Sequence, residues 1–109
     1  MPRNEPDQHE QFINSSTLLL NALSNATRLQ LLQILCEGEI SVGSLSELVG
    51  TSKSAVSQHL ATLRYADLVS ARRDAQTVYY CCNSLAVKKV LAILSEVYAP
   101  AETSLSYIA

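Results

Sequence analysis

The sequence predicts a mainly α-helical domain with a small β-hairpin, in the α+β class. Three observations favour this class. Apolar residues recur at helical spacing in five segments, two of which form a close pair within residues 41–68. A tight turn at Gly50 separates that pair. From Leu68 onward the apolar period changes to that of a strand, in two short runs rich in β-branched and aromatic residues.

The length and composition fit one globular domain. The chain has 109 residues, of which 48% are hydrophobic, and its formal net charge is −2. Between residues 51 and 80, four basic residues stand against two acidic ones, which gives a local charge of +2. This distribution argues against a generally basic coat and makes the second half of the fold the electropositive part.

The three cysteines, Cys36, Cys81 and Cys82, have neither an even count nor a C-x-x-C spacing. Residues 1–11 are polar, so no signal peptide is predicted, and no apolar run is long enough to span a bilayer. These features predict free thiols in a reducing, cytoplasmic setting without membrane association.

Residues 1–10 contain two prolines and no apolar period, which predicts a disordered N-terminal tail. Helices are predicted over 11–23 and 26–36, with Asn25 capping the second and Gly38 ending it. The folded domain is expected to span residues 11–100. It ends in a helix over 85–99 that Pro100 stops, followed by a C-terminal tail over 101–109.

Residues 41–68 predict a helix-turn-helix. Val42, Leu45 and Val49 share one face of its first helix, and Thr51 or Ser52 caps the second. The second helix has an apolar stripe and an opposite face of short, polar or cationic residues. The stripe consists of Val56, Leu60 and Leu63, and the outward face of Lys53, Ser54, Ser57, Gln58, Ala61 and Arg64. A base-reading helix needs such a face to enter the major groove, although many surface helices carry polar outer faces.

Two strands are predicted over 68–73 and 76–82, joined at Asp74-Ala75. No glycine supplies a positive φ there, so a loop longer than two residues is expected. A hairpin directly after a helix-turn-helix is a wing, and Arg72, Arg73 and Gln76 are placed to contact phosphates or the minor groove. The alternative is a small ribbon with ordinary surface charges.

The first and last predicted helices carry more apolar surface than one small core can bury. The apolar arc of residues 85–99 covers roughly 160°, against about 100° for a helix that faces a single core. This excess predicts a homodimer through the two terminal helices, and a helix on a membrane surface is the alternative. The expected interface residues are Phe12, Leu19, Leu20, Val90, Leu94 and Val97.

Four strings follow one another in the chain: LLNALSNATRLQLLQIL, SVGSLSELV, SAVSQHLATLR and RRDAQTVYY. On these strings the chain resembles the ArsR/SmtB family of bacterial winged-helix repressors over residues 15–100, and within it the branch of the NolR, HlyU and BigR regulators. The resemblance implies a winged helix-turn-helix homodimer that binds an inverted-repeat operator on double-stranded DNA. It also implies DNA contacts from Lys53, Ser54, Ser57 and Gln58, with Arg72, Arg73 and Gln76 on the wing.

No metal site and no cofactor are predicted. The family's thiolate pair would fall at residues 40–42, which are Ile-Ser-Val, and residues 85–99 lack the Asp and His ligands of the family's other site. In some members a cysteine near the end of the second helix pairs with one at the end of the last helix. Cys36 matches the first position, but Ala99 occupies the second.

Cys36 therefore stays either a candidate redox residue or a small apolar core residue. Cys81 and Cys82, on the wing strand, are expected near the helix-turn-helix rather than near the end of the second helix. The effector, if the protein has one, is unknown from the sequence.

An enzyme is not predicted, because the chain has no nucleophile spacing, paired carboxylates or glycine-rich phosphate loop. A winged helix that binds another protein instead of DNA is the alternative from a different class. Such a module would need an apolar or acidic outward face on the second helix of the pair, where this sequence has cations and hydroxyls.

Overall fold

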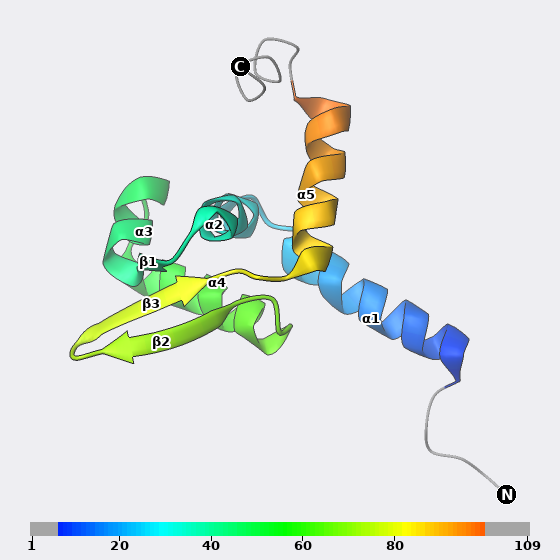
Figure 1. The fold of residues 1–109 in the computed structure, drawn as a ribbon, viewed down its shortest axis with the longest axis horizontal. Coiled ribbons are helices and arrows are strands. Elements are labelled where there is room, and N and C mark those ends of the chain that lie inside the picture. Colours follow the sequence, from blue (N-terminus) through cyan, green and yellow to red (C-terminus); the bar gives the residue numbers. More distant parts are fainter. Residues whose placement is uncertain (1–6, 100–109) are drawn as a thin grey trace, which may run out of the picture.

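The computed structural model describes residues 7–99. Its elements are α1 (Gln8–Leu23), α2 (Ala26–Glu37), β1 (Ile40–Ser41), α3 (Val42–Val49), α4 (Lys53–Tyr65), β2 (Ser70–Asp74), β3 (Thr77–Cys81) and α5 (Leu85–Tyr98), as Figure 1 shows. The five predicted helices and the predicted hairpin are all present, so the winged helix-turn-helix class is confirmed. Residues 1–6 and 100–109, which include most of the predicted N-terminal tail and all of the predicted C-terminal tail, lie outside the described residues.

Each helix begins at a side chain that accepts a hydrogen bond from a backbone N–H group of its first turn. The caps are Asp7, Asn25, Ser41, Ser52 and Ser84. Asp7 accepts from the N–H of Glu10 at 2.8 Å. Because of this cap, α1 begins at Gln8, three residues before the predicted start.

The core is built around α2. Leu31, Leu32 and Leu35 of this helix are fully buried. They belong to one cluster with buried residues of α3, α4 and α5, namely Leu45, Val56, Leu60, Leu63 and Val87. The apolar stripes predicted for α3 and α4 therefore face the core, and the opposite side of α4 faces solvent.

The sheet has three strands in the order β1-β3-β2, and both pairings are antiparallel. The sequence pattern did not predict β1, which has only two residues and pairs Ile40 with Tyr80. Asp74 pairs with Thr77, so the hairpin loop has two residues, Ala75 and Gln76. The expectation of a longer loop is wrong, because Ala75 itself adopts a positive φ of 58°.

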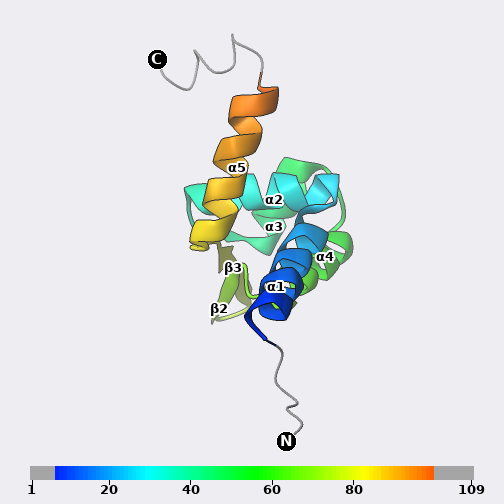
Figure 2. The same cartoon turned by 90° about the vertical axis from the view of Figure 1, so that its right-hand side faces the viewer.

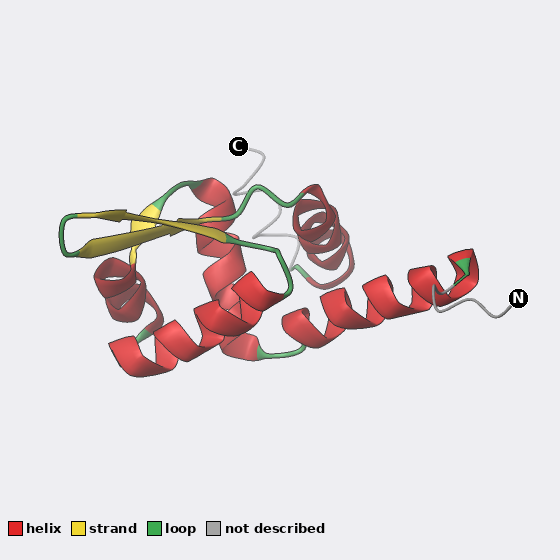
Figure 3. Ribbon diagram, turned by 90° about the horizontal axis from the view of Figure 1, so that it is seen from below, coloured by secondary structure: helices red, strands yellow, loops and turns green. Residues whose placement is uncertain are grey.

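The two terminal helices extend away from the core in different directions (Figures 1 and 2). Seen from below, α1 and the wing lie at opposite ends of the molecule (Figure 3). Both helices carry exposed apolar side chains, which include Phe12, Ile13, Leu18, Leu20, Ile93 and Val97. Within residues 7–99 no helix has the length and apolar character needed to cross a membrane.

Candidate nucleic-acid interface

Helix α4 has a buried apolar side and an exposed polar side. Val56, Leu60 and Leu63 have no exposed surface. The polar side chains predicted to read DNA are all exposed on the solvent side: Lys53, Ser54, Ser57, Gln58 and Arg64. The exposed residues offer hydroxyl, amide and cationic donors that match base edges and phosphates in the major groove.

The turn before α4 is held by hydrogen bonds. Gly50 adopts the left-handed conformation at φ 72°, which glycine enters without steric cost. The backbone N–H groups of Gly50 and Thr51 donate to the carbonyl of Ser46 at 3.0 and 3.2 Å. The hydroxyl of Ser46 donates to the carbonyl of Thr51 at 2.5 Å. This network sets the angle between α3 and α4 and so the direction in which α4 presents its polar face.

The other end of α4 is closed by a Schellman motif. Asp67 has a φ of 61° and donates its N–H to the carbonyl of Arg64 at 2.9 Å, while Leu68 donates to Leu63 at 3.0 Å. Tyr65, which lies within this motif, is 85% exposed. Tyr65 is the last residue of α4, and the sequence pattern gave no reason to include it in the site.

Arg28 joins the first helices to α4, a role that the sequence analysis missed. Its Nε donates to the carbonyl of Ala22 at 2.6 Å, and its Nη2 donates to the carbonyl of Asn21 at 3.0 Å. Its Nη1 lies 3.5 Å from Nδ1 of His59. His59 is half-buried, so its ring packs between Arg28 and the body of α4 rather than standing free in solvent.

The two arginines of the wing differ in their surroundings. Nε and Nη2 of Arg72 donate to the two carboxylate oxygens of Glu39, each at 2.7 Å, and the guanidinium lies 4.5 Å from the centre of the Tyr79 ring. The hydrogen bond from Arg72 lowers the pKa of Glu39. Arg73 and Gln76 are exposed, and Arg73 has no ion-pair partner among residues 7–99.

Glu39 was not part of the predicted site. It lies just before β1, and β3 separates β1 from β2, so the Glu39–Arg72 pair spans the sheet above Tyr79. A two-residue strand gives no periodic signal, and without β1 the sequence could not bring residue 39 beside residue 72.

The predicted dimer residues divide into two groups. Phe12, Leu20 and Val97 are exposed by 65, 59 and 63%. Leu19 and Val90 are half-buried and contact the core of their own chain, and Leu94 is also half-buried. The exposed group leaves an apolar surface on α1 and α5.

The expectation that Cys82 lies far from the end of the second helix is wrong. The backbone N–H of Cys82 donates to the carbonyl of Leu35, in the last turn of α2, at 3.2 Å. Cys82 is buried and Cys36 is half-buried beside it. The strand pairing of β1 with β3 brings the end of β3 to the end of α2, a contact that depends on the unpredicted β1.

No cluster of three or more His, Cys, Asp or Glu side chains that could hold a metal ion occurs in the described part of the chain.

Comparisons with known proteins agree with this geometry. Residues 25–71 match the family model described as "Bacterial regulatory protein, arsR family". The chain is 47% identical over 93 residues to the nodulation protein NolR of Rhizobium meliloti, a match that covers 85% of this chain and 75% of NolR. It is 45% identical over 86 residues to the transcriptional activator HlyU of Vibrio cholerae, covering 79% of this chain and 80% of HlyU.

Solved structures give the same result. The crystal structure of NolR from Sinorhizobium fredii is 46% identical and superposes with a TM-score of 0.80, covering 93% of this chain and all of that one. A solution structure of a homodimeric winged helix-turn-helix DNA-binding domain from Mycobacterium bovis, 27% identical, has a TM-score of 0.74 and covers 88% of this chain and 89% of its own.

Proposed function

Because this chain belongs to the arsR family of bacterial regulatory proteins, and is thus a DNA-binding transcriptional regulator rather than an enzyme, we propose that it represses transcription as a homodimer on an inverted-repeat operator. In this proposal the α4 helices of the two subunits read bases in successive major grooves, about 34–36 Å apart. Repression follows from occlusion of the promoter. The proposed location is the cytoplasm, and no metal or cofactor is required.

The observation that carries the proposal is the polar solvent face of α4. Gln58 lies in the middle of that face, with Ser54 and Ser57 beside it. A glutamine amide donates and accepts at once, which suits the N6 and N7 atoms of adenine. Short serines let the helix backbone approach the base edges. We assign base reading to Ser54, Ser57 and Gln58, and phosphate contacts to Lys53 and Arg64.

The wing contributes to the proposed interface through Arg73 and Gln76. Both side chains are exposed near the tip of the hairpin. Arg72 faces Glu39 and Tyr79 instead, so its predicted contact with DNA requires that it leave an ion pair with two short hydrogen bonds. We therefore assign the phosphate contact of the wing to Arg73.

The exposed apolar residues of α1 and α5 support the homodimer. Phe12, Leu20 and Val97 are large, apolar and more than half exposed, and water contact with such side chains is removed when a second copy covers them. A related DNA-binding domain is described as homodimeric. An exposed apolar arc on both terminal helices gives the self-complementary surface that a two-fold axis needs.

Selection of bound duplexes from a random pool, followed by fluorescence anisotropy on the selected duplex, tests the proposal. We expect a two-fold symmetric site with half-site centres one helical turn apart. Gln58→Ala is expected to weaken binding to that site by about 1–3 kcal/mol and to relax the base preference at one position of each half-site. Gln30→Ala, which removes an exposed glutamine from α2, serves as the matched control and should bind like the native protein.

A selected site without two-fold symmetry would contradict the inverted-repeat operator. Equal loss of affinity for selected and random duplexes in Gln58→Ala would contradict its assignment as a base reader.

A further inference from the structure

Two cysteines that are 46 positions apart in the sequence meet where α2 ends and β3 leads into α5. The backbones are joined by the hydrogen bond from the N–H of Cys82 to the carbonyl of Leu35. The Cys36 side chain packs against the core cluster to which Cys82 belongs, and the two thiols interact electrostatically. Cys82 is only 1% exposed, whereas Cys36 is half-buried, so solutes reach this pair through Cys36.

The third cysteine is excluded from the pair by the geometry of the strand. Successive side chains of an extended segment point to opposite faces. Sγ of Cys81 lies 3.3 Å from the hydroxyl of Ser70, across the β2–β3 pairing, and 3.7 Å from Nδ2 of Asn83. Cys81 and Cys82 are therefore neighbours in sequence with different surroundings, which provides a natural control.

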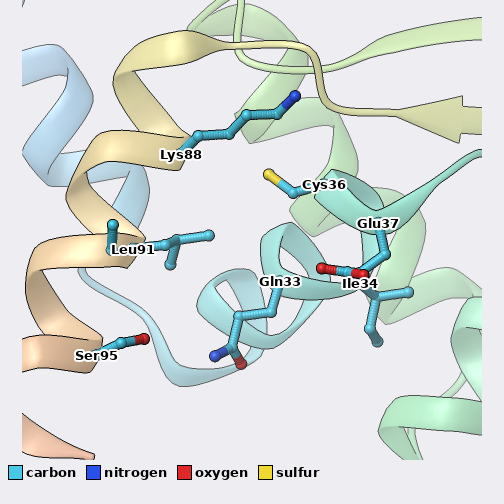
Figure 4. A pocket seen from close by; sticks show the side chains of 8 residues that line it. Gln33, Ile34, Cys36, Glu37, Lys88, Leu91 and Ser95 are labelled. Atoms are coloured by element: carbon cyan, nitrogen blue, oxygen red, sulfur yellow. The ribbon is translucent and has the colours of Figure 1, made fainter. Parts of the chain in front are cut away.

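A pocket between α2 and α5 gives solutes a path to Cys36. It has a volume of about 660 Å³, and its lining includes Gln33, Glu37, Lys88 and Leu91. Figure 4 shows the Cys36 sulfur directed into the space between the two helices, on the side where Lys88 extends. A small peroxide fits a space of this size.

We propose that Cys36 and Cys82 form a dithiol site at which a hydroperoxide produces an intramolecular disulfide. The Cys36 thiolate attacks the terminal peroxide oxygen, the O–O bond breaks, and the alkoxide leaves as an alcohol after it takes a proton. The product is the sulfenic acid of Cys36. Sγ of Cys82 then attacks that sulfur, the S–O bond breaks, and hydroxide leaves as water with the Cys82 proton. Two thiols are thereby oxidised while one peroxide is reduced to an alcohol and water.

The surroundings of Cys36 make the first step slow at neutral pH. Burial, followed by the hydrogen bond with Cys82, raises the pKa of the Cys36 thiol to about 12. The charge of Glu37 adds to the rise and that of Lys88 opposes it. Only the thiolate attacks, so the rate should increase about tenfold for each unit by which the pH is raised, as long as the pH stays below that pKa. This site therefore responds to sustained exposure to peroxide rather than to brief pulses.

The bridge would join the end of α2 to the base of the wing. The segment between the two cysteines contains β1, α3, α4, β2 and all of β3, so the disulfide closes a loop around the whole proposed DNA-binding unit. Neither cysteine lies on the polar face of α4 or at the tip of the wing. We expect the bridge to stabilise the fold against heat while leaving DNA affinity within about threefold.

Mass spectrometry of the full-length protein tests the site without DNA. Reduced protein is treated with cumene hydroperoxide at pH 7 and at pH 8, quenched by alkylation and analysed intact. We expect each chain to lose two hydrogen atoms, and Cys36 and Cys82 to become resistant to alkylation. This oxidation should be about tenfold faster at the higher pH. Cys36→Ser and Cys82→Ala should abolish this loss, and Cys81→Ser should retain it. The oxidised native protein should show a melting temperature at least about 5 °C higher.

Fragmentation of the cross-linked peptide between residues 81 and 82 identifies the bridge in the native chain, even if Cys82→Ala does not fold. A bridge at Cys81, or a product that consists only of disulfide-linked dimers through Cys36, would overturn the assignment. A more than tenfold loss of affinity for DNA on oxidation, present in Cys81→Ser and absent in Cys82→Ala, would show that the bond disables binding and would overturn its stabilising role.

Discussion

The helix-turn-helix and the terminal helices differ in how completely a single chain buries their apolar side chains. Leu45, Leu60 and Leu63 of α3 and α4 are fully buried within the chain. Phe12 of α1 and Val97 of α5 have similar apolar character but are exposed by 65 and 63%. The helix-turn-helix thus buries its apolar stripes in a single copy, whereas α1 and α5 leave apolar side chains in water that a second copy would cover in the proposed dimer.

The largest effect is expected from a cavity in the helix-turn-helix. Leu60→Ala should lower the free energy of unfolding by about 2–5 kcal/mol, because Leu60 is fully enclosed and the core cannot collapse onto the space left behind. Urea denaturation at one fixed protein concentration measures this change. Leu48→Ala on α3 removes a leucine that is 63% exposed and should change stability by about 0.5 kcal/mol or less. Equal losses in the two variants would contradict the distinction between the regions.

A charge on the exposed side of α5 should separate the subunits. Val97→Glu places a carboxylate in the proposed dimer interface, where desolvation without a partner is unfavourable. We expect the dimer dissociation constant in sedimentation velocity to rise at least about tenfold while helical content stays native. Leu85→Glu is the matched control, because Leu85 is 65% exposed on the same helix but points away from Val97 by the helical period.

A native protein that sediments as a folded monomer at micromolar concentration would contradict the proposed role of α1 and α5. If Leu85→Glu dissociated the dimer as much as Val97→Glu, the interface would lie on another side of α5.

The sequence was sufficient for features that depend on local pattern, and insufficient for those that depend on distant pairing. The stripe of Val56, Leu60 and Leu63 follows from helical periodicity, and the left-handed turn follows from Gly50. The two-residue β1 is too short to show a period. Without it, neither the ion pair between Glu39 and Arg72 nor the approach of residue 82 to the end of α2 is predictable.

The polar face of α4 was also predictable, since the helical period that places the apolar stripe on one side places the polar residues on the other. The sequence did not predict which side chains of the wing are free to contact DNA. The sequence treats Arg72 and Arg73 as equivalent neighbours, but strand alternation sends them to opposite faces of the sheet, and only one of those faces carries Tyr79 and the approach to Glu39.

The difference between the two wing arginines is testable by salt dependence. Arg73→Gln should weaken binding to all duplexes and reduce the slope of log affinity against log salt by about one unit, because one phosphate contact is lost. Arg72→Gln should leave that slope unchanged, because its guanidinium is held by Glu39. Lys89→Gln, which removes the same charge from an exposed site on α5, controls for net charge. A lower slope in Arg72→Gln would show that Arg72 leaves Glu39 to contact DNA.

The smallest effect concerns the hairpin loop, which lies outside the terminal helices. Ala75 has a φ of 58°, whereas Gln76, the other loop residue, is not among the residues with positive φ. A hairpin loop position with a positive φ favours glycine, which has no Cβ to clash with the backbone there. Ala75→Gly removes the steric cost of the left-handed conformation but adds freedom to the unfolded chain. We expect a net stabilisation of up to about 1 kcal/mol, measured by thermal denaturation. Gln76→Gly changes the neighbouring position, where no positive φ is relieved, and should destabilise the wing by a similar amount.

Because both changes act within one chain, their effects should be the same in the native dimer and in the Val97→Glu background. A stabilisation that disappeared with the dimer would place the wing under the control of the second subunit.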